Sequence, residues 1–115
     1  MAVRLSLVIP AYNEEIRIAM TLDRVGKYLS RQGYDFEIIV VDDGSLDTTP
    51  ELVRALYPSV RVIEYKPNRG KGYAVKIGMI EAQGEYRVFC DADGSTPIEE
   101  LDRMWKCFDS GADIV

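Results

Sequence analysis

The sequence contains no histidine. This absence removes the side chain that most often acts as a general base near neutral pH, and with it every catalytic triad built on an imidazole. It also excludes most zinc sites, because these rely on histidine and cysteine ligands. The chemistry of the chain must therefore come from other residue types.

Cysteine and long apolar runs are scarce as well. Only Cys90 and Cys107 are present, so a disulfide framework is not expected and a reducing cytoplasm fits the composition. No apolar run approaches the length of a membrane span. The stretch "LSLVIPA" near the start is too short for a signal-peptide core. We expect a soluble cytoplasmic piece, at the cytoplasmic face of a membrane only if residues beyond Val115 attach it there.

Positive charge is outnumbered by negative charge. Lys and Arg total 14, Asp and Glu total 19, and the formal net charge is −5. This balance argues against non-specific binding to nucleic acid or to an anionic membrane surface. The 115 residues are 47% hydrophobic and 29% charged, which is typical of one globular domain.

Two hydrophobic periods alternate along the chain. Strands are predicted for four runs rich in apolar residues, at 5–10, 36–43, 60–65 and 86–91. Helical spacing or helix-start signals follow each of them, at 13–29, 49–57, 73–82 and 97–109. Asn13 is the expected N-cap of the first helix, and Thr96 with Glu99 has the spacing of a capping box for the last.

This alternation predicts an α/β fold with a mostly parallel sheet and right-handed crossovers. Ligands of such open sheets bind at the carboxyl ends of the strands. Three polar clusters are predicted to meet at that edge, at 10–14, 42–45 and 91–96. The final "GADIV" resembles the start of a fifth strand, so we expect the chain to be the front part of a longer protein.

Asp91 and Asp93 follow an apolar strand and precede Gly94. On an extended segment, side chains at i and i+2 point the same way, and such a pair suits Mg²⁺ or Mn²⁺ completed by water and phosphate oxygens. The alternative is an ordinary turn, since Asp and Gly are common turn residues.

Two further clusters admit a ligand-binding and a structural interpretation. Asp42 or Asp43 could accept hydrogen bonds from a nucleotide base or ribose; the alternative is a capping turn in which Asp43, Ser45 and Asp47 bind exposed backbone N–H groups. Tyr12 could stack on a planar base or cover the start of a helix.

The loop "NRGKG", residues 68–72, places Arg69 and Lys71 among glycines before a helix. Glycine-rich backbone in this position can cradle a phosphate. The loop is not a Walker A motif, because Gly72 follows Lys71 where Ser or Thr is required. The alternative is a solvated basic loop.

Taken together, "VIPAYNEE", "IIVVDDGSLDTT", "NRGKGYAVKIGM" and "FCDADGSTPIEEL" resemble the family 2 glycosyltransferases. The similarity covers nearly the whole chain and is greatest to the branch that glycosylates dolichyl or other polyprenyl phosphates with glucose or mannose. The resemblance implies a GT-A fold, a three-layer α/β/α arrangement, of which residues 1–115 would form the nucleotide-sugar-binding portion.

The resemblance also implies residue roles. Four residues would frame the nucleotide base: Pro10, Ala11, Tyr12 and Glu14. Asp42 would hydrogen-bond the base with Asp43 beside it, and Arg69 and Lys71 would lie near the nucleotide. Asp91 and Asp93 would hold the ribose and a Mg²⁺ or Mn²⁺ ion on the diphosphate of a UDP- or GDP-sugar.

The implied reaction is an inverting transfer of a hexose to an acceptor. A lipid phosphate is already an anionic nucleophile and needs no strong base, whereas a sugar hydroxyl in polysaccharide synthesis would need one. We expect that base and most of the acceptor site to lie beyond Val115, so this chain alone should be poorly active. The uncovered sheet edge also makes a homo-oligomer an expectation.

Three rival interpretations stay open at this point. "VFCDADGST" resembles the haloacid-dehalogenase phosphohydrolase motif, in which the aspartate matching Asp91 is a nucleophile, but that motif normally opens its domain. A sugar-phosphate nucleotidyltransferase usually has a glycine-rich basic loop after its first strand, and "PAYNEE" is not one. A nucleotide-binding module without catalysis is the third.

Overall fold

The protein is built around a four-stranded parallel sheet. The structure is a computed structural model that describes residues 3–94 and 97–109. The strands lie in the order β3-β2-β1-β4. Their bounds are Leu5–Ala11 for β1, Phe36–Asp43 for β2, Arg61–Tyr65 for β3 and Tyr86–Phe89 for β4. The predicted parallel α/β architecture is therefore confirmed.

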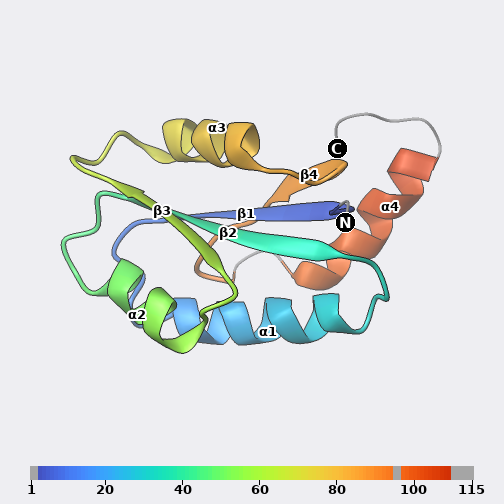
Figure 1. The fold of residues 1–115 in the computed structure, drawn as a ribbon, viewed down its shortest axis with the longest axis horizontal. Helices are drawn as coiled ribbons and strands as arrows, with labels where there is room; N and C mark the ends of the chain where they lie inside the picture. Colours follow the sequence, from blue (N-terminus) through green and yellow to red (C-terminus); the bar gives the residue numbers. More distant parts are fainter. Residues whose placement is uncertain (1–2, 95–96, 110–115) are drawn as a thin grey trace.

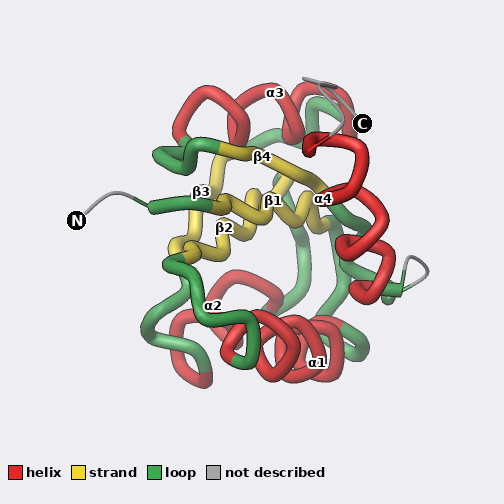
Figure 2. The backbone as a smooth tube through the Cα atoms, turned by 90° about the vertical axis from the view of Figure 1, so that its right-hand side faces the viewer, coloured by secondary structure: helices red, strands yellow, loops and turns green. Residues whose placement is uncertain are grey.

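Helices cover both faces of the sheet. Helices α1 (Ile18–Ser30) and α2 (Thr49–Leu56) lie on one face, and α3 (Lys71–Glu81) lies on the other (Figure 1). A short 3₁₀ turn, Ile98–Glu100, leads into α4 (Leu101–Asp109). Figure 2 shows α4 beside the β4 side of the sheet, between the levels of α3 and α1.

The core is divided into two layers by the strands. All seven residues of β1 are buried, because it is a central strand with apolar side chains on both faces. Leu7 and Ile9 face the larger cluster, which includes residues of α1 and α2. Val8 points the other way, toward a smaller cluster that contains Ala74 of α3.

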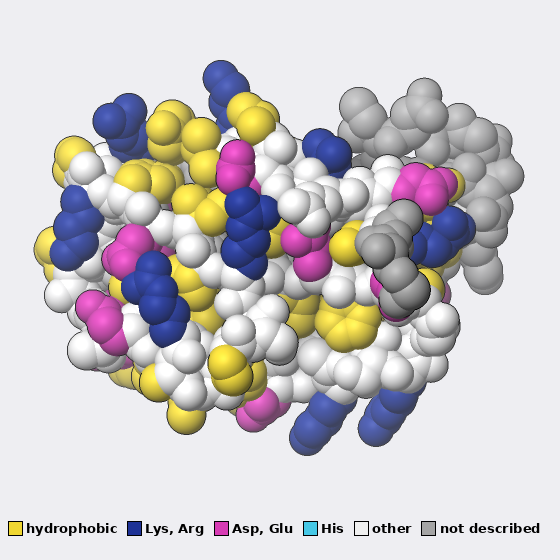
Figure 3. Space-filling view, in the orientation of Figure 1, with side chains coloured by type: hydrophobic (Ala, Val, Ile, Leu, Met, Phe, Trp, Pro, Cys, Tyr) yellow, Lys and Arg dark blue, Asp and Glu magenta, His cyan; other side chains and the backbone are white. Residues whose placement is uncertain are grey.

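Surface charge is mixed rather than segregated. The face in Figure 3 shows Lys and Arg side chains interspersed with Asp and Glu, and hydrophobic side chains exposed over α3. Ile80 of α3 is 62% exposed. Among the described residues, no helix has the length and apolar character needed to cross a membrane.

Helix α1 begins four residues later than predicted, since its N-cap is Arg17 instead of Asn13. Asn13 has φ +54° and does not cap the helix. Its backbone N–H donates to Ser45 Oγ at 2.9 Å, and its Oδ1 accepts from the Leu46 N–H at 2.8 Å. These bonds commit Asn13 to the neighbouring β2–α2 loop. Ile16, which falls within the predicted helix range 13–29, precedes α1 and is 91% exposed.

The other boundaries shift less. Strand β4 ends at Phe89, two residues before the predicted end, and α3 begins at Lys71, two residues before its predicted start. The fifth strand predicted from the final "GADIV" and the Thr96 cap lie outside the described residues.

Candidate functional site

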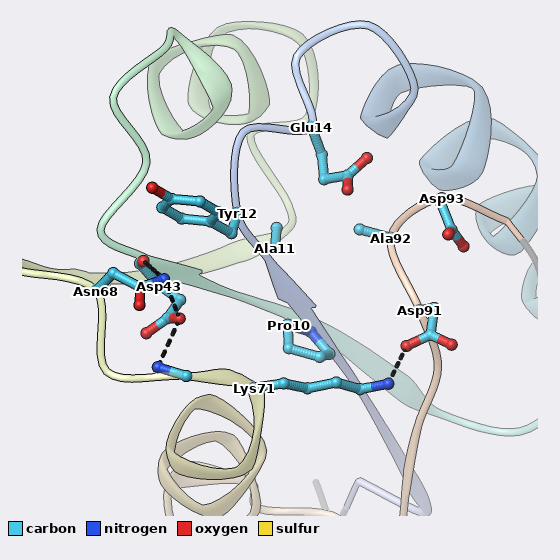
Figure 4. Close-up of a pocket in the computed structure, with 11 residues that line it drawn as sticks. Pro10, Ala11, Tyr12, Glu14, Asp43, Asn68, Lys71, Asp91, Ala92 and Asp93 are labelled. Carbon is cyan, nitrogen blue, oxygen red and sulfur yellow. Dashed lines mark hydrogen bonds and ion pairs between the residues drawn. The ribbon is translucent and has the colours of Figure 1, made fainter.

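A pocket of about 280 Å³ opens at the carboxyl edge of the sheet. Its wall combines the end of β1, the end of β2, the start of α3 and the loop after β4 (Figure 4). The lining residues are Pro10, Ala11, Tyr12, Glu14, Asp43, Asn68, Gly70, Lys71, Asp91, Ala92 and Asp93. The structure thus brings together members of all three clusters that the sequence placed at this edge.

The segment that carries Asp91 and Asp93 is a tight turn. The Gly94 N–H lies 3.4 Å from the Asp91 carbonyl, and Gly94 has φ +74°, which a glycine adopts without strain. The predicted extended geometry is therefore wrong, because β4 has already ended. Ala92 is buried and its carbonyl accepts from Thr21 Oγ1 at 2.7 Å, which fixes the turn to α1. Both aspartates still line the pocket.

Lys71 spans the pocket floor. Its side chain runs from the start of α3 past Pro10 to Asp91 (Figure 4). The Nζ atom lies 2.5 Å from Asp91 Oδ1. One of the two predicted metal-binding carboxylates is thus paired with the protein's own cation.

Asp43 is the most heavily hydrogen-bonded carboxylate of the pocket. It is 3% exposed. Its oxygens accept from Tyr65 Oη at 2.5 Å, from Asn68 Nδ2 at 2.8 Å, and from the Arg69 and Gly70 N–H groups at 2.9 Å each. Burial raises the Tyr65 pKa, and the hydrogen bond to Asp43 and the charge of Asp43 raise it further, so the phenol remains a donor. Asp43 therefore fixes the loop between β3 and α3.

These bonds change the interpretation of the glycine-rich loop. The sequence left open whether this backbone faces a phosphate or solvent, and the Arg69 and Gly70 N–H groups are instead directed at Asp43. The loop also passes directly over Gly44, where a Cβ would meet the Asn68 nitrogen at 2.5 Å. The anion in this backbone cradle is thus a side chain of the protein itself.

Arg69 and Asp42 lie away from the described pocket wall. The Arg69 guanidinium sits 5.1 Å from the centre of the Tyr73 ring. Asp42 is completely buried and accepts from the Ser45 N–H at 3.0 Å and from Ser45 Oγ at 2.5 Å. Burial raises the pKa of Asp42, and the two bonds from Ser45 oppose that shift. Asp42 does not line the pocket, so its position does not support the predicted contact with a nucleotide base. The turn at Ser45 is capped by Asp42 and not by Asp43, for which a capping role was predicted.

Tyr12 and Glu14 line the pocket on the side across from Lys71 (Figure 4). Tyr12 lines the pocket and is 41% exposed, so a ligand can reach its side chain. Glu14 pairs with Arg17, Nη2 to Oε2 2.8 Å, and its backbone N–H donates to Thr49 Oγ1 at 2.9 Å. The wall is therefore held by α2 as well as by β1.

The donor set fits a divalent cation held by few protein ligands. Asp91 and Asp93 supply hard carboxylate oxygens to one pocket. Among the described residues, no group of three or more His, Cys, Asp or Glu side chains could hold a metal ion. Two carboxylates completed by water and phosphate is the pattern expected for Mg²⁺ or Mn²⁺ and unlike a closed calcium or zinc cage.

Asn68, Gly70 and Ala92 line the pocket but were not predicted from the sequence. Asn68 lies between Pro67 and Arg69 in a loop, where no periodicity singles it out. Its only sequence signal is its position beside the basic residues.

Residues 6–115 match the family described as "Glycosyl transferase family 2". The dolichyl-phosphate beta-glucosyltransferase of Dictyostelium discoideum is 41% identical over 110 residues, which cover 87% of this chain and 34% of that protein. The enzyme of the same name from Mus musculus is 42% identical over 113 residues, which cover 90% of this chain and 35% of that protein. The chain thus spans about a third of the length of these relatives.

Solved structures agree with this match. S. aureus TarS 1-349 in complex with UDP-GlcNAc has a TM-score of 0.73 and 28% identity, covering 93% of this chain and 31% of that one. The mannosyltransferase PcManGT from Pyrobaculum calidifontis, in complex with GDP-Man and Mn²⁺, has a TM-score of 0.66 and 33% identity, covering 81% and 28%. The predicted GT-A fold is confirmed by these neighbours.

Proposed function

Because the chain belongs to glycosyl transferase family 2, we propose that it binds the sugar nucleotide of an enzyme that transfers a hexose to a polyprenyl phosphate. One observation carries the proposal: a single pocket joins the accessible Tyr12 ring to Lys71, Asp91 and Asp93. A nucleoside diphosphate sugar has the matching sequence of groups, a planar base followed by two phosphates.

The orientation of the ligand follows from the arrangement of the pocket, in which the aromatic side chain and the charged side chains lie in different parts of the wall. The base would lie against Pro10 and Tyr12, at the end of β1. The diphosphate would lie toward Lys71 and the 91–93 turn, where the pocket holds a cation and two carboxylates. The reverse orientation would place the phosphates away from Lys71, with Tyr12 as their neighbour, which is electrostatically worse.

Asp91 and Asp93 would hold the divalent ion. A bound Mg²⁺ or Mn²⁺ neutralises the charge that develops on a departing diphosphate. The Thr21 bond to the Ala92 carbonyl would keep the two carboxylates at a fixed position beside the ligand. An acceptor that attacks the anomeric carbon from the side opposite the diphosphate would invert its configuration.

The names of the relatives favour a lipid phosphate as acceptor and glucose as the transferred sugar. A phosphate monoester carries its own negative charge near neutral pH, so it attacks without a strong general base. A reaction that needs no strong general base is compatible with a chain that has no histidine. A lipid acceptor would also place the whole enzyme at a membrane, on its cytoplasmic face.

The rival functions have less support. The family match begins at residue 6 and includes the "PAYNEE" and "VVDDGS" stretches, which the phosphohydrolase interpretation leaves unexplained. The nucleotidyltransferase interpretation lacks its glycine-rich loop after β1.

Calorimetric titration of the protein with UDP and with GDP, each with and without Mn²⁺, tests the proposal. We expect binding of one nucleotide to be strengthened by Mn²⁺ and lost in Asp93→Ala. Asp35→Ala is a suitable control, because Asp35 is also exposed but lies at the opposite edge of the sheet. Binding of neither nucleotide, or equal binding by Asp93→Ala, would rule out this site.

A further inference from the structure

The ammonium group of Lys71 occupies the place beside Asp91 where a bound metal ion is expected. Its Nζ atom lies 2.5 Å from Asp91 Oδ1 and 5.8 Å from the centre of the Phe89 ring. The lysine side chain is 57% exposed and that of Asp91 is 35% exposed. The ion pair therefore lies at the pocket surface, where a ligand can reach both partners.

The backbone of Lys71 is fixed, although its side chain is long. The two preceding N–H groups, of Arg69 and Gly70, donate to the buried Asp43 carboxylate. Lys71 then begins α3, whose Ala74 is packed against the sheet. Only the four-carbon stem is left to adjust, so the ammonium can move a few ångströms without rearrangement of the loop.

A divalent ion and the Lys71 ammonium cannot share Asp91 favourably. Two like charges at contact distance repel each other, and the repulsion is stronger when one of them is divalent. A diphosphate in the same pocket would offer the displaced ammonium a new anionic partner. The most favourable anionic partner of the Lys71 ammonium thus depends on whether a divalent ion and a diphosphate are bound.

We propose that Lys71 is an internal counter-cation that neutralises Asp91 in the empty site and transfers to the diphosphate when a divalent ion takes the carboxylate. The inference rests on the proposed function for the identity of the nucleotide. Lys71 would then link the two binding events. The metal alone must displace the ammonium, whereas metal and nucleotide together leave both cations paired.

This exchange has a thermodynamic signature. In the wild type, the nucleotide should increase metal affinity, and the metal should increase nucleotide affinity by the same factor. Removal of the ammonium should make metal binding easier in the absence of nucleotide. It should also reduce the coupling between the two ligands.

Mn²⁺ titration followed by electron paramagnetic resonance tests these statements on wild type and Lys71→Met, with and without UDP or GDP. Methionine retains an unbranched stem and removes the charge. Without nucleotide, Lys71→Met should bind Mn²⁺ about three- to tenfold tighter than wild type. The enhancement of Mn²⁺ affinity by nucleotide should be smaller in the variant by a similar factor.

Lys76→Met is the matched control. Lys76 is exposed on the same helix and outside the pocket, so its loss changes the net charge equally and should leave both quantities as in wild type. Unchanged or weaker Mn²⁺ binding by Lys71→Met would overturn the inference, as would the absence of Mn²⁺ binding in both proteins without nucleotide. Either result leaves the proposed function intact if wild type still binds UDP or GDP. The expected Mn²⁺ shift without nucleotide binding by wild type would instead refute the proposed function together with the transfer of Lys71 to the diphosphate, and would support only its pairing with Asp91 in the empty site.

Discussion

Asp42 and Asp43 are adjacent in sequence and have different roles. Successive residues of a strand point to opposite faces of the sheet. Asp42 is paired with Ala11 in the β-ladder and turns toward the α1 and α2 layer, where it caps the turn at Ser45. Asp43 turns toward the α3 layer and accepts the bonds of the loop that precedes Lys71.

Replacement of Asp43 by asparagine should loosen that loop. The side-chain amide would present N–H donors where one carboxylate oxygen now accepts, so at least one donor among the loop N–H groups, Asn68 and Tyr65 would lose its partner. We expect a loss of about 1–3 kcal/mol in the free energy of unfolding. Urea denaturation measures this loss, and hydrogen exchange should show faster exchange of the Arg69 and Gly70 amides.

Asp35→Asn provides the comparison, because Asp35 is exposed and its carboxyl group is outside these contacts. Wild-type exchange rates for the Arg69 and Gly70 amides in Asp43→Asn would mean that the loop is held by other contacts.

The sequence could place Asp91 and Asp93 at the pocket edge, but it could not tell whether Asp43 binds a ligand or the protein itself. A carboxylate pair after an apolar strand is a local signal that is visible in a few residues. Three partners of Asp43 lie 25 to 27 residues further along the chain, in an irregular loop, and the fourth is Tyr65, 22 residues away in β3. No periodicity fixes such a distance, so the choice between a ligand and the protein's own backbone was settled only by the three-dimensional structure.

At the scale of elements, α3 approaches the sheet through small residues. Its fully buried positions are Ala74 and Gly78. A Cβ at Gly78 would meet Val8 Cγ1 at 2.3 Å and Val41 Cγ2 at 3.0 Å. The helix axis is therefore as close to β1 and β2 as a glycine permits, and this close packing fixes the distance between the start of α3, which carries Lys71, and the sheet.

Gly78→Ala should consequently destabilise the protein. Overpacking against two valines costs about 1–3 kcal/mol, while alanine regains up to about 1 kcal/mol of helix propensity. The net effect is a loss of stability, measurable as a lower urea midpoint. Gly72→Ala on the same helix has no atom within 4 Å of its Cβ and should be neutral or stabilising. Equal effects of the two substitutions would contradict this packing argument.

The elements differ in how far the sequence determined them. The predicted β2 coincides with the observed strand, because its apolar run and closing aspartates are both local signals. The start of α1 was misplaced because Asn13 bonds to the β2–α2 loop, 32 and 33 residues away. Cross-loop hydrogen bonds of this kind outweigh the helix-start pattern in the sequence.

At the scale of the whole molecule, the two edges of the sheet have different character. The pocket occupies the carboxyl edge. At the amino edge, Trp105 of α4 packs edge-on against Tyr34 and Tyr86, with ring centres 5.4 and 5.0 Å away, and the Arg4 guanidinium lies 5.2 Å from its ring centre. This cluster attaches α4 to the strands at the end farthest from the ligand site.

Trp105 is the only tryptophan, so its fluorescence reports on the amino edge alone. Its ring packs against the same core cluster that α1, β1 and β2 share. We therefore expect urea unfolding followed by Trp fluorescence to coincide with unfolding followed by far-ultraviolet circular dichroism, as a single cooperative unit requires. A fluorescence transition at lower urea would mean that α4 detaches before the sheet unfolds.

Ligand binding at the nucleotide site gives a second test of whether the protein unfolds as one cooperative unit. Ligand that binds only the folded state stabilises the whole cooperative unit, by about 2.7 kcal/mol at a concentration 100 times its Kd. UDP or GDP with Mn²⁺, whichever binds, should therefore raise the fluorescence and dichroism midpoints equally, although Trp105 lies at the opposite edge. Asp93→Ala should show coincident transitions that the ligand does not move. A ligand shift in the dichroism midpoint alone would show that the two edges unfold separately, since binding at one edge would then leave the other unaffected.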